Sequence, residues 1–332
     1  MKKASRKKDL IIVTGGAGFI GSAFVWKLNE EGVDRILIVD RLDTTDKWKN
    51  LVKRRFTDYI HKDEFLQAVQ AGRFRHPVQA VIHMGACSST TERDADYLMR
   101  NNYQYSVELA RWSLKNGVHF IYASSAATYG DGSRGFSDDD AVTKTLAPIN
   151  MYGYSKQLFD LWVLANGLEK KVTGIKFFNV FGPNEYHKDD MRSMVHKSYG
   201  QISETGKVRL FKSHRPDYRD GAQARDFVYI KDCVEVLWWF LRHRRAGGIF
   251  NLGSGYARTW NDLTQAVFDA LGIKKQVEYI EMPETIRGQY QYFTEAKMDK
   301  LRSAGCPVTF RSLEDAVYDY VVNHLKTKDP YL

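Results

Sequence analysis

The sequence predicts an α/β protein built on a doubly wound parallel sheet, with a smaller, mostly C-terminal lobe beside it. Short apolar runs alternate with longer amphipathic segments from Leu10 to about Lys171, which is the pattern of repeated β-α units. The apolar runs contain no regular polar alternation, so both faces of the sheet are expected to be covered. A glycine-rich turn directly follows the first run. Together these observations indicate a Rossmann fold.

Each expected element follows from its local pattern. Short apolar runs predict strands, and apolar residues at helical spacing predict helices. The expected strands are Leu10–Thr14, Ile36–Asp40, Ala80–Met84, Phe120–Ser124, Thr173–Val180 and Ile249–Leu252. The expected helices are Ser22–Glu31, Thr91–Asn116, Asn150–Leu168 and Met191–Ser203, and one that starts near Asp232 as its N-cap.

The regular alternation lapses after Gly182 and Pro183, where charged, loop-rich sequence begins. We therefore expect residues 9–183 to form the Rossmann domain and residues 184–332 to form the second lobe. Residues from about 227 to 255 again carry helix and strand patterns and are expected to return to the Rossmann domain. The basic residues 1–8 are expected to form a disordered tail.

Composition argues against several classes of protein. The chain has 332 residues with 43% hydrophobic side chains, which is enough for a sizeable core. Its three cysteines are widely spaced, so we expect free thiols, a reducing cytoplasmic location and no metal site. The longest apolar runs fall well short of the roughly 20 residues that cross a bilayer, so no membrane association is expected.

The formal net charge is +9, and part of this excess lies in residues 1–8. Elsewhere basic residues are scattered among acidic ones, without the aromatic-interleaved basic stripe of a nucleic-acid surface. We therefore expect no nucleic-acid partner and favour a site for an anionic small molecule.

The turn after the first strand carries Gly15, Gly18 and Gly21, and an amphipathic helix follows it. Glycines at this spacing allow a tight turn and let a pyrophosphate approach the amides at the helix N-terminus. Ser22 is expected to add a hydroxyl donor. An ordinary glycine-rich turn is the alternative, but the strand before the turn and the helix after it favour a dinucleotide-binding loop.

Asp40 ends the second strand, about twenty residues after the glycine loop. An acid at this place binds the ribose hydroxyls of NAD. Arg41 follows immediately, and Lys47 and Lys62 come soon after. Because cationic groups favour the 2′-phosphate of NADP, the charges alone leave both cofactors open.

Tyr152 and Lys156 lie four residues apart at the start of an expected helix, so they share one face. A lysine beside a phenol is expected to lower the pKa of Tyr152 toward neutrality, which makes the tyrosine a general base. Ser125 ends the preceding strand and could hold the substrate oxygen. Tyr154 is a competing base, but no lysine follows it four residues later.

At this point the sequence resembles the extended short-chain dehydrogenase/reductases, and within them the ADP-L-glycero-D-manno-heptose 6-epimerase family. The resemblance covers Leu10 to about Tyr320. The narrower motifs are Gly85–Thr91, Asn101–Ser106, Tyr122–Gly130, Phe178–Pro183, His187–Lys188 and Arg225–Tyr229. It implies inversion at C6″ of ADP-heptose through a transient 6″-ketone, for the lipopolysaccharide inner core. It also implies one tightly bound NADP per subunit and a homo-oligomer, by family precedent a homopentamer.

The same resemblance implies roles for particular residues. Lys188 would be a second acid/base opposite Tyr152, although the charge pattern alone favours a solvated surface lysine. The residues that would line the cofactor are Phe19, Ile20, Asp40, Arg41, Lys47, Lys62, Met84, Gly85, Ala86, Cys87, Ser88, Asn101 and Lys156. Those that would contact the substrate are Ser125, Asn179, Val180, Lys188, Lys197, Phe211, Arg225 and Tyr290; for the apolar residues in both sets, core packing is the alternative.

Two departures from the family and two alternative functions remain. Arg41 stands where the family commonly has asparagine, and Ser213–Gly221 is longer than in better-known members.

A nucleotide-sugar 4-epimerase of the same superfamily would share the glycine loop and Tyr152 but would not need Lys188. A non-catalytic NADP-binding regulatory protein is the alternative from another class.

Overall fold

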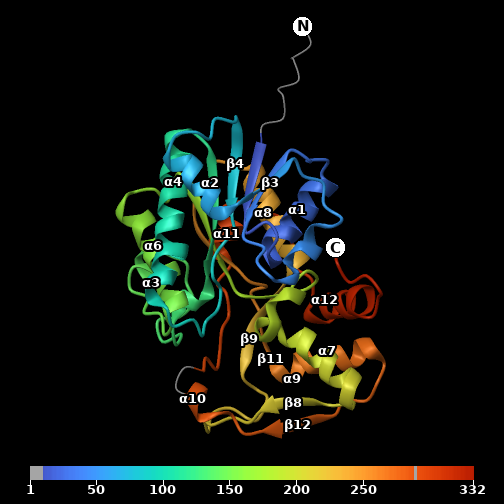
Figure 1. The fold of residues 1–332 in the computed structure, drawn as a ribbon. Helices are drawn as coiled ribbons and strands as arrows, with labels where there is room; N and C mark the ends of the chain where they lie inside the picture. The colour runs from blue at the N-terminus through green and yellow to red at the C-terminus, as the bar shows by residue number, and fades with distance from the viewer. Residues whose placement is uncertain (1–9, 288–289) are drawn as a thin grey trace.

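A seven-stranded sheet forms the centre of the larger lobe in the computed structural model, which describes residues 10–287 and 290–332 (Figure 1). Every neighbouring pair of its strands is parallel. The strand order is β10-β6-β5-β4-β1-β2-β3, so the direction of winding reverses between β1 and β4. This confirms the doubly wound sheet, whose ligand crevice is expected at that reversal. The predicted tail, residues 1–8, lies outside the described residues.

Helices cover both faces of the large sheet. Its strands are β1 (Leu10–Thr14), β2 (Ile36–Asp40), β3 (Asp58–His61), β4 (Val78–His83), β5 (His119–Ser125), β6 (Val172–Phe177) and β10 (Gly248–Leu252). One face carries α1 (Phe19–Glu30) and α8 (Ile230–Arg242); the other carries α2 (Lys62–Gln70), α4 (Tyr105–Lys115) and α6 (Met151–Ala165). In β1, Ile11 and Val13 pack in the core that contains α1 and α8. Leu10 and Ile12 pack in the core on the opposite face, with α2, α4 and α6. Because successive side chains point to opposite faces, a strand buried on both sides needs an unbroken apolar run.

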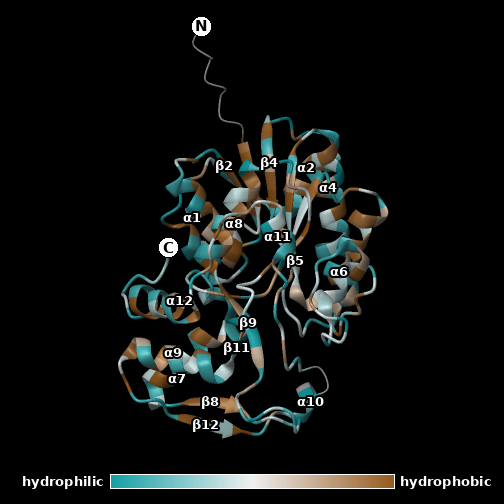
Figure 2. Cartoon of the chain, turned by 180° about the vertical axis from the view of Figure 1, so that it is seen from behind, coloured by the Kyte–Doolittle hydropathy of each residue, from teal (hydrophilic) through white to brown (hydrophobic). Residues whose placement is uncertain are grey.

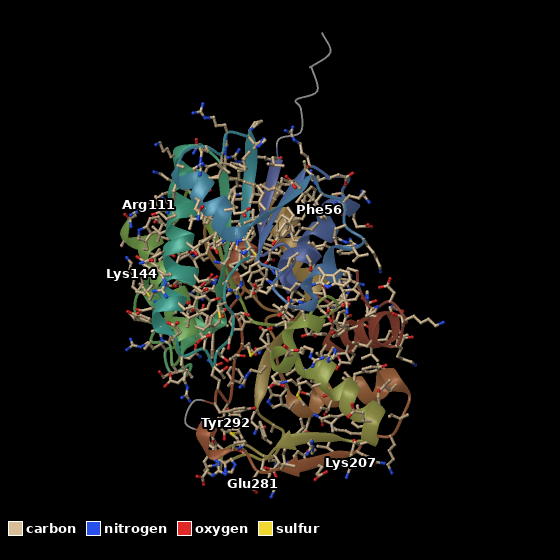
Figure 3. The ribbon with its side chains drawn as sticks, in the orientation of Figure 1. Phe56, Arg111, Lys144, Lys207, Glu281 and Tyr292 are labelled. Atoms are coloured by element: carbon tan, nitrogen blue, oxygen red, sulfur yellow. The ribbon has the colours of Figure 1, made fainter. Side chains whose placement is uncertain are left out.

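The smaller lobe has two sheets of its own. One contains β7 (Asn179–Phe181), β9 (Ala224–Tyr229) and β11 (Ala257–Thr259), and the other pairs β8 (Val208–Phe211) with β12 (Val277–Ile280). Its helices are α7 (Met194–Thr205), α9 (Trp260–Leu271), α10 (Glu284–Arg287) and α12 (Leu313–Tyr320). Figure 2 shows hydrophobic residues in the strands of the large sheet and also in β8 and β12 of the small lobe. Figure 3 marks Phe56 and Arg111 on the large lobe and Lys207, Glu281 and Tyr292 on the small one.

Shorter helical segments connect these elements. They are η1 (Asp46–Leu51), α3 (Ala95–Leu98), η2 (Met99–Gln104), η3 (Ala126–Tyr129), α5 (Asp140–Thr143), η4 (Tyr186–Met191), α11 (Asp299–Ser303) and η5 (Val321–Leu325). Within the part of the chain that the structure describes, no helix has the length and apolar character needed to span a membrane.

One strand prediction differs from the structure, and five strands, β3, β8, β9, β11 and β12, were not predicted. The expected strand Thr173–Val180 ends at Phe177, because the chain leaves the large sheet there and enters β7 of the small lobe. The backbone amide of Phe178 marks the exit by donating to the carbonyl of Leu252 at 3.0 Å. The edge strand β3 was not predicted, since its largely polar and partly exposed residues form no apolar run. The other expected strands are confirmed with small shifts at their ends.

Several helix starts were also wrong. The helix expected from Ser22 begins at Phe19, and the one expected from Met191 begins at Met194. The helix expected from Thr91 begins at Ala95, where the Asp94 carboxylate accepts from the amide of Tyr97 at 2.8 Å, and it passes through the π-helical η2 before α4. Asp232 is not an N-cap, because α8 already begins at Ile230. Its carboxylate accepts from the backbone amide of Arg311 at 2.9 Å.

A fully buried ion pair joins helix α6 to strand β6 of the large sheet. Lys176 lies 2.9 Å from Asp160, and neither side chain is exposed to solvent. The Asp160 carboxylate also accepts from the hydroxyls of Tyr122 at 2.9 Å and Ser124 at 2.7 Å. A buried carboxylate with this many donors depends on all of them, because an uncompensated charge in the core is costly.

Removal of the Lys176 ammonium is therefore expected to destabilise the protein strongly. Lys176→Met leaves the Asp160 carboxylate without its cation and should lower the free energy of unfolding by about 3–5 kcal/mol. Urea unfolding at neutral pH measures the change. Exposed Lys171 provides the control, since Lys171→Met should change the free energy of unfolding by less than about 0.5 kcal/mol. Equal unfolding midpoints for the two variants would contradict this account.

Candidate active site

The glycine loop is a close contact between two backbones at the reversal of the sheet. Gly15 has a φ of +65°, and a Cβ placed on it would lie 2.6 Å from backbone atoms of Gly85 after β4. A Cβ on Gly21 would lie 2.1 Å from the carbonyl oxygen of Gly15. Only glycine fits at these two positions, so the loop packs tightly against the start of α1.

The N-terminus of α1 is left open for an anion. Gly18 occupies the N-cap without a side-chain cap, and the first turn holds no acidic residue. The amides of this turn therefore lack side-chain acceptors, which is the arrangement that binds pyrophosphate. Ser22 does not add the expected donor, because its hydroxyl donates to the carbonyl of Phe19 and accepts from Asn184 at 3.0 Å.

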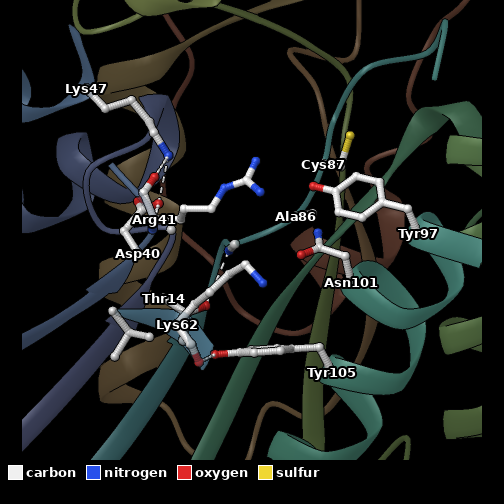
Figure 4. A pocket seen from close by; sticks show the side chains of 13 residues that line it. Thr14, Asp40, Arg41, Lys47, Lys62, Ala86, Cys87, Tyr97, Asn101 and Tyr105 are labelled. Atoms are coloured by element: carbon white, nitrogen blue, oxygen red, sulfur yellow. Dashed lines mark hydrogen bonds and ion pairs between the residues drawn. The ribbon is translucent and has the colours of Figure 1, made fainter. Parts of the chain in front are cut away.

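Asp40 is enclosed by donors at the end of β2. One carboxylate oxygen accepts from the amide of Ala17 at 2.8 Å, and the other accepts from the amide of Arg41 at 2.7 Å and from Lys47 at 2.8 Å. The Arg41 and Lys62 side chains extend toward the open space of the pocket (Figure 4). The negative charge of Asp40 is thus neutralised by Lys47, while Arg41 and Lys62, which pair with Asp43 and Asp63 at 2.7 Å, also line the pocket.

The pocket at this edge gathers most of the predicted cofactor residues. Its lining is Thr14, Gly15, Val39, Asp40, Arg41, Lys47, Lys62, Gly85, Ala86, Cys87, Tyr97, Asn101 and Tyr105. Tyr97 and Tyr105 were not predicted; both come from the helical segment after the Gly85–Thr91 motif. The predicted cofactor residues outside this lining are Gly18, Phe19, Ile20, Gly21, Met84, Ser88 and Lys156. The amide of Cys87 donates to the side chain of Asn102 at 2.9 Å, which fixes the loop after β4.

Tyr152, Ser125 and Lys156 lie together where β5 and α6 meet. Asn150 caps α6 by accepting from the amide of Gly153 at 2.8 Å, and Tyr152 shares a side-chain hydrogen bond with Ser125. The Lys156 ammonium donates to the carbonyl of Ala123 at 2.8 Å. Tyr152 and Ser125 are therefore in direct contact, and the Lys156 ammonium lies at the end of the strand that carries Ser125.

The prediction that Lys156 lowers the pKa of Tyr152 was wrong. Burial raises the pKa of Tyr152, and the hydrogen bond from Ser125 opposes that rise. Burial also lowers the pKa of Lys156 to about 8, against the attraction of Asp160. The Lys156 ammonium is bonded to a backbone carbonyl, and desolvation of the phenol sets the direction of the shift in the Tyr152 pKa.

Lys188 lies in η4, close to the glycine loop and not out in solvent. Its ammonium is 5.1 Å from the centre of the Phe19 ring. Burial lowers the pKa of Lys188; the charge of Lys197 lowers it further, whereas that of Glu185 raises it. The surface-lysine alternative is therefore wrong, and a partly desolvated amine with a lowered pKa is suited to proton transfer. Asp189 follows at φ 45°, ψ −122°, a strained conformation for a residue with a side chain.

Arg225 lies in an aromatic enclosure on the small lobe. Its guanidinium is 5.2 Å from the ring of Tyr290 and 5.7 Å from that of Trp260, whose indole donates to the Tyr290 hydroxyl at 2.8 Å. It also donates to the carbonyl of Gln291. Trp260 was not predicted, because a single tryptophan at a helix start carries no distinguishing spacing.

The other predicted substrate residues are more dispersed. Asn179 and Val180 begin β7, at the exit from the large sheet, and Asn179 is exposed. Phe211 ends β8, away from the pocket at the end of β2. Lys197 lies in α7 and donates to the carbonyl of Asp190 at 2.6 Å, so it supports the turn that carries Lys188. Among residues 10–287 and 290–332, no group of three or more His, Cys, Asp or Glu side chains could hold a metal ion.

A neutral histidine is hydrogen-bonded to Thr14, the residue that precedes the glycine loop. His83 lies 2.6 Å from the Thr14 hydroxyl and 2.9 Å from the Ser106 hydroxyl. Burial lowers the pKa of His83 to about 3, with a smaller contribution from Lys156. The imidazole therefore stays uncharged while the protein is folded at any pH above that value.

Acid is expected to destabilise the protein through His83. As the pH falls below 6.5, the unfolded chain binds a proton at this imidazole and the folded chain does not. The free energy of unfolding should therefore fall by about 1.4 kcal/mol per pH unit from this group. His83→Gln should reduce the loss between pH 7 and pH 5, measured by urea unfolding, by about 2 kcal/mol. His76→Gln, at an exposed position, should keep the wild-type pH dependence; the same result for His83→Gln would refute the assignment.

Comparisons with known proteins find relatives that match nearly the whole chain. An ADP-L-glycero-D-manno-heptose-6-epimerase of Nitratidesulfovibrio vulgaris is 60% identical over 97% of this chain and 100% of the relative. The crystal structure of the Helicobacter pylori ADP-L-glycero-D-manno-heptose-6-epimerase matches 97% of this chain and 99% of its own, with a TM-score of 0.80 and 26% identity. The UDP-glucose 4-epimerase of Thermus thermophilus, solved with NAD, shares the fold over 94% of this chain and 97% of its own, with a TM-score of 0.73 and 24% identity.

The family model of the NAD dependent epimerase/dehydratases matches residues 11–253, which span the large sheet from β1 to β10. That range contains the glycine loop, the Ser125/Tyr152/Lys156 group and Lys188. The chain therefore belongs to the NAD dependent epimerase/dehydratase family.

Proposed function

We propose that the protein inverts C6″ of ADP-D-glycero-D-manno-heptose to give ADP-L-glycero-D-manno-heptose, the heptose donor for the lipopolysaccharide core. The observation that carries this proposal is the placement of Lys188 against Phe19 of the glycine loop, separate from Tyr152. Inversion through a 6″-ketone needs a proton to be taken from the C6″ hydroxyl in one orientation and returned to the ketone oxygen in the opposite one. A single fixed phenol serves only one face, so a second proton carrier at the cofactor loop is the feature that the reaction demands.

Tyr152 is the proposed proton carrier on one face. Tyr152 and Ser125 are hydrogen-bonded to each other, so a substrate oxygen bound beside Tyr152 would also contact the serine hydroxyl. Lys156, whose ammonium donates to the carbonyl of Ala123 at the end of β5, would hold the ribose of a bound nicotinamide cofactor. A bound nicotinamide cofactor supplies hydride acceptance and return, and the side chains named here hold and move the protons.

Lys188 is the proposed carrier on the opposite face. Burial lowers the pKa of its amine, which allows the neutral form to take a proton from the C6″ hydroxyl. Glu185, fully buried next to it, accepts from both the amide and the hydroxyl of Ser193, at 2.5 Å and 2.6 Å. The turn is thereby fixed while the amine is left free to act.

The cofactor is proposed to be NADP, tightly bound, one in each subunit. Asp40 uses its oxygens on two backbone amides and Lys47, so it is less available to ribose hydroxyls. Arg41 and Lys62 line the same pocket and offer charge-assisted bonds to a 2′-phosphate. The residues present thus fit NADP better than NAD.

The substrate is proposed to lie between the two lobes. Arg225, enclosed by Trp260 and Tyr290, is suited to the pyrophosphate, with Asn179, Val180, Lys197 and Phe211 as further contacts. In this assignment residues 9–183 bind the cofactor, and residues 184–332 bind the sugar nucleotide, apart from the part near 227–255 that returns to the large sheet. We further propose a cytoplasmic homo-oligomer, by family precedent a homopentamer.

The function is tested by incubating the purified protein, without added cofactor, with ADP-D-glycero-D-manno-heptose and resolving the C6″ epimers by NMR. Wild type is expected to equilibrate them, and Tyr152→Phe and Lys188→Met should each lose about 10²-fold or more in rate. Exposed Tyr154→Phe is the matched control and should keep the wild-type rate. Inversion of a UDP-hexose at C4 instead, independent of Lys188, would favour a ring 4-epimerase; no turnover of either sugar would favour a regulatory protein.

Cofactor choice is tested separately by titrating cofactor-free protein with NADP and NAD. Arg41→Ala and Lys62→Ala should each weaken NADP binding by about tenfold and leave NAD binding nearly unchanged, because a charge-assisted bond is lost. Lys49→Ala supplies the control, since Lys49 pairs with Asp46 outside the pocket and should change neither affinity. Equal losses for both cofactors in the pocket variants would contradict the assignment to NADP.

A further inference from the structure

The segment Pro330–Leu332, here called the C-terminal clasp, is bonded to the turn that carries Lys188. The amide of Leu332 donates to the side-chain oxygen of Asn184 at 3.1 Å, and the hydroxyl of Tyr186 donates to the carbonyl of Pro330 at 2.8 Å. The rings of Tyr186 and Tyr331 meet edge to face, with centroids 5.0 Å apart. Figures 1 and 2 both show the C-terminal end beside α1 and α12.

The clasp is held in turn by the segment that follows η1. Arg54 donates to the carbonyl of Leu332 at 2.6 Å, and Lys53 donates to the carbonyl of Tyr331 at 2.9 Å. Lys53 also pairs with Asp329 at 2.7 Å. The preceding segment, η1 (Asp46–Leu51), carries Asn50 and also Lys47, which lines the cofactor pocket. The clasp therefore bridges the cofactor-binding region and the Lys188 turn.

Asn184 is the point where these contacts converge. It is fully buried and has a φ of +77°, a conformation that asparagine tolerates better than most residues. Its oxygen accepts from Leu332, its amide donates to Ser22 at the start of α1, and its carbonyl accepts from Asn50 at 3.1 Å. Asn50 also donates to the carbonyl of Ala17 in the glycine loop, at 2.9 Å. Loss of the Leu332 donor would leave a buried amide oxygen unpaired.

We propose that the C-terminal clasp positions the Lys188 turn against the glycine loop and thereby serves the proton transfer at Lys188, but not the one at Tyr152. The clasp contacts Asn184 and Tyr186, four and two residues before Lys188. Lys156 and Ser125, by contrast, are fixed by Ala123 and Ala127 at the end of β5. This inference rests on the proposed function, because it needs two proton carriers that act in opposite directions of the reaction.

The test uses variants that remove single bonds. Leu332→Pro deletes the amide donor, and Leu332→Ala is its matched control because it keeps that amide. Tyr186→Phe removes the hydroxyl bonded to Pro330 and keeps the ring. Tyr318→Ala, at an exposed position of α12, controls for general effects in the same region. Thermal unfolding and bound cofactor content are measured for every variant.

The readout is the single-turnover formation of reduced nicotinamide from each C6″ epimer separately, in the holoenzyme. Lys188→Met and Tyr152→Phe define which epimer depends on which base. Leu332→Pro and Tyr186→Phe are expected to slow oxidation of the Lys188-dependent epimer by about tenfold or more and to leave the other epimer within about twofold of wild type. Leu332→Ala and Tyr318→Ala should match wild type for both epimers.

Equal slowing of both epimers, with or without a loss of thermal stability, would show that the clasp has only a structural role. Wild-type rates for both epimers in Leu332→Pro and Tyr186→Phe would show that it has no role. If Leu332→Pro does not fold, Tyr186→Phe alone decides the matter. A wild-type protein that oxidises neither heptose would refute the proposed function and the inference together, whereas an active wild type with unselective variants refutes the inference alone.

Discussion

The contact between Gly15 and Gly85 is the constraint on which the site depends. These residues follow the two strands where the winding of the sheet reverses, and their backbones approach so closely that a Cβ on Gly15 would lie 2.6 Å from Gly85. That approach directs the first turn of α1 toward the crevice and places Asp40, Ala17 and the loop after β4 around one pocket. The phosphate-binding geometry is therefore a property of sheet topology as much as of the glycine pattern.

The distribution of charge around the crevice follows a common plan. The carboxylates of Asp40, Asp160 and Glu185 are each bonded to several donors within the protein. Arg41 and Lys62, which pair with Asp43 and Asp63 at 2.7 Å, line the pocket, and Lys188 lies against the Phe19 ring. Because the buried acids are bonded within the protein, these basic side chains favour an anionic ligand at the crevice. The net charge of the whole chain gives only a weak indication of this local arrangement.

Much of the fold could be predicted from the sequence, because buried parallel strands leave unbroken apolar runs such as Leu10–Thr14 and the glycine loop has a distinctive spacing. The exit of the chain at Phe178 could not, since the apolar run continues through it while the sheet changes. The proximity of Ser125, Tyr152 and Lys156 follows from helix periodicity and strand position, but the pKa of Tyr152 depends on burial, which no local pattern reports. The roles of Trp260, Asn184 and the clasp arise from contacts between distant segments.

The clasp joins residues that are very far apart in the chain, since Arg54 and Leu332 are separated by 278 positions and Asn184 and Leu332 by 148. Closing such long loops carries an entropic cost that nearby contacts in β1 and α1 do not have. The Lys188 turn therefore reaches its final geometry only after both lobes have folded and docked. Refolding should restore the Rossmann core, and with it cofactor affinity, before it restores catalytic competence.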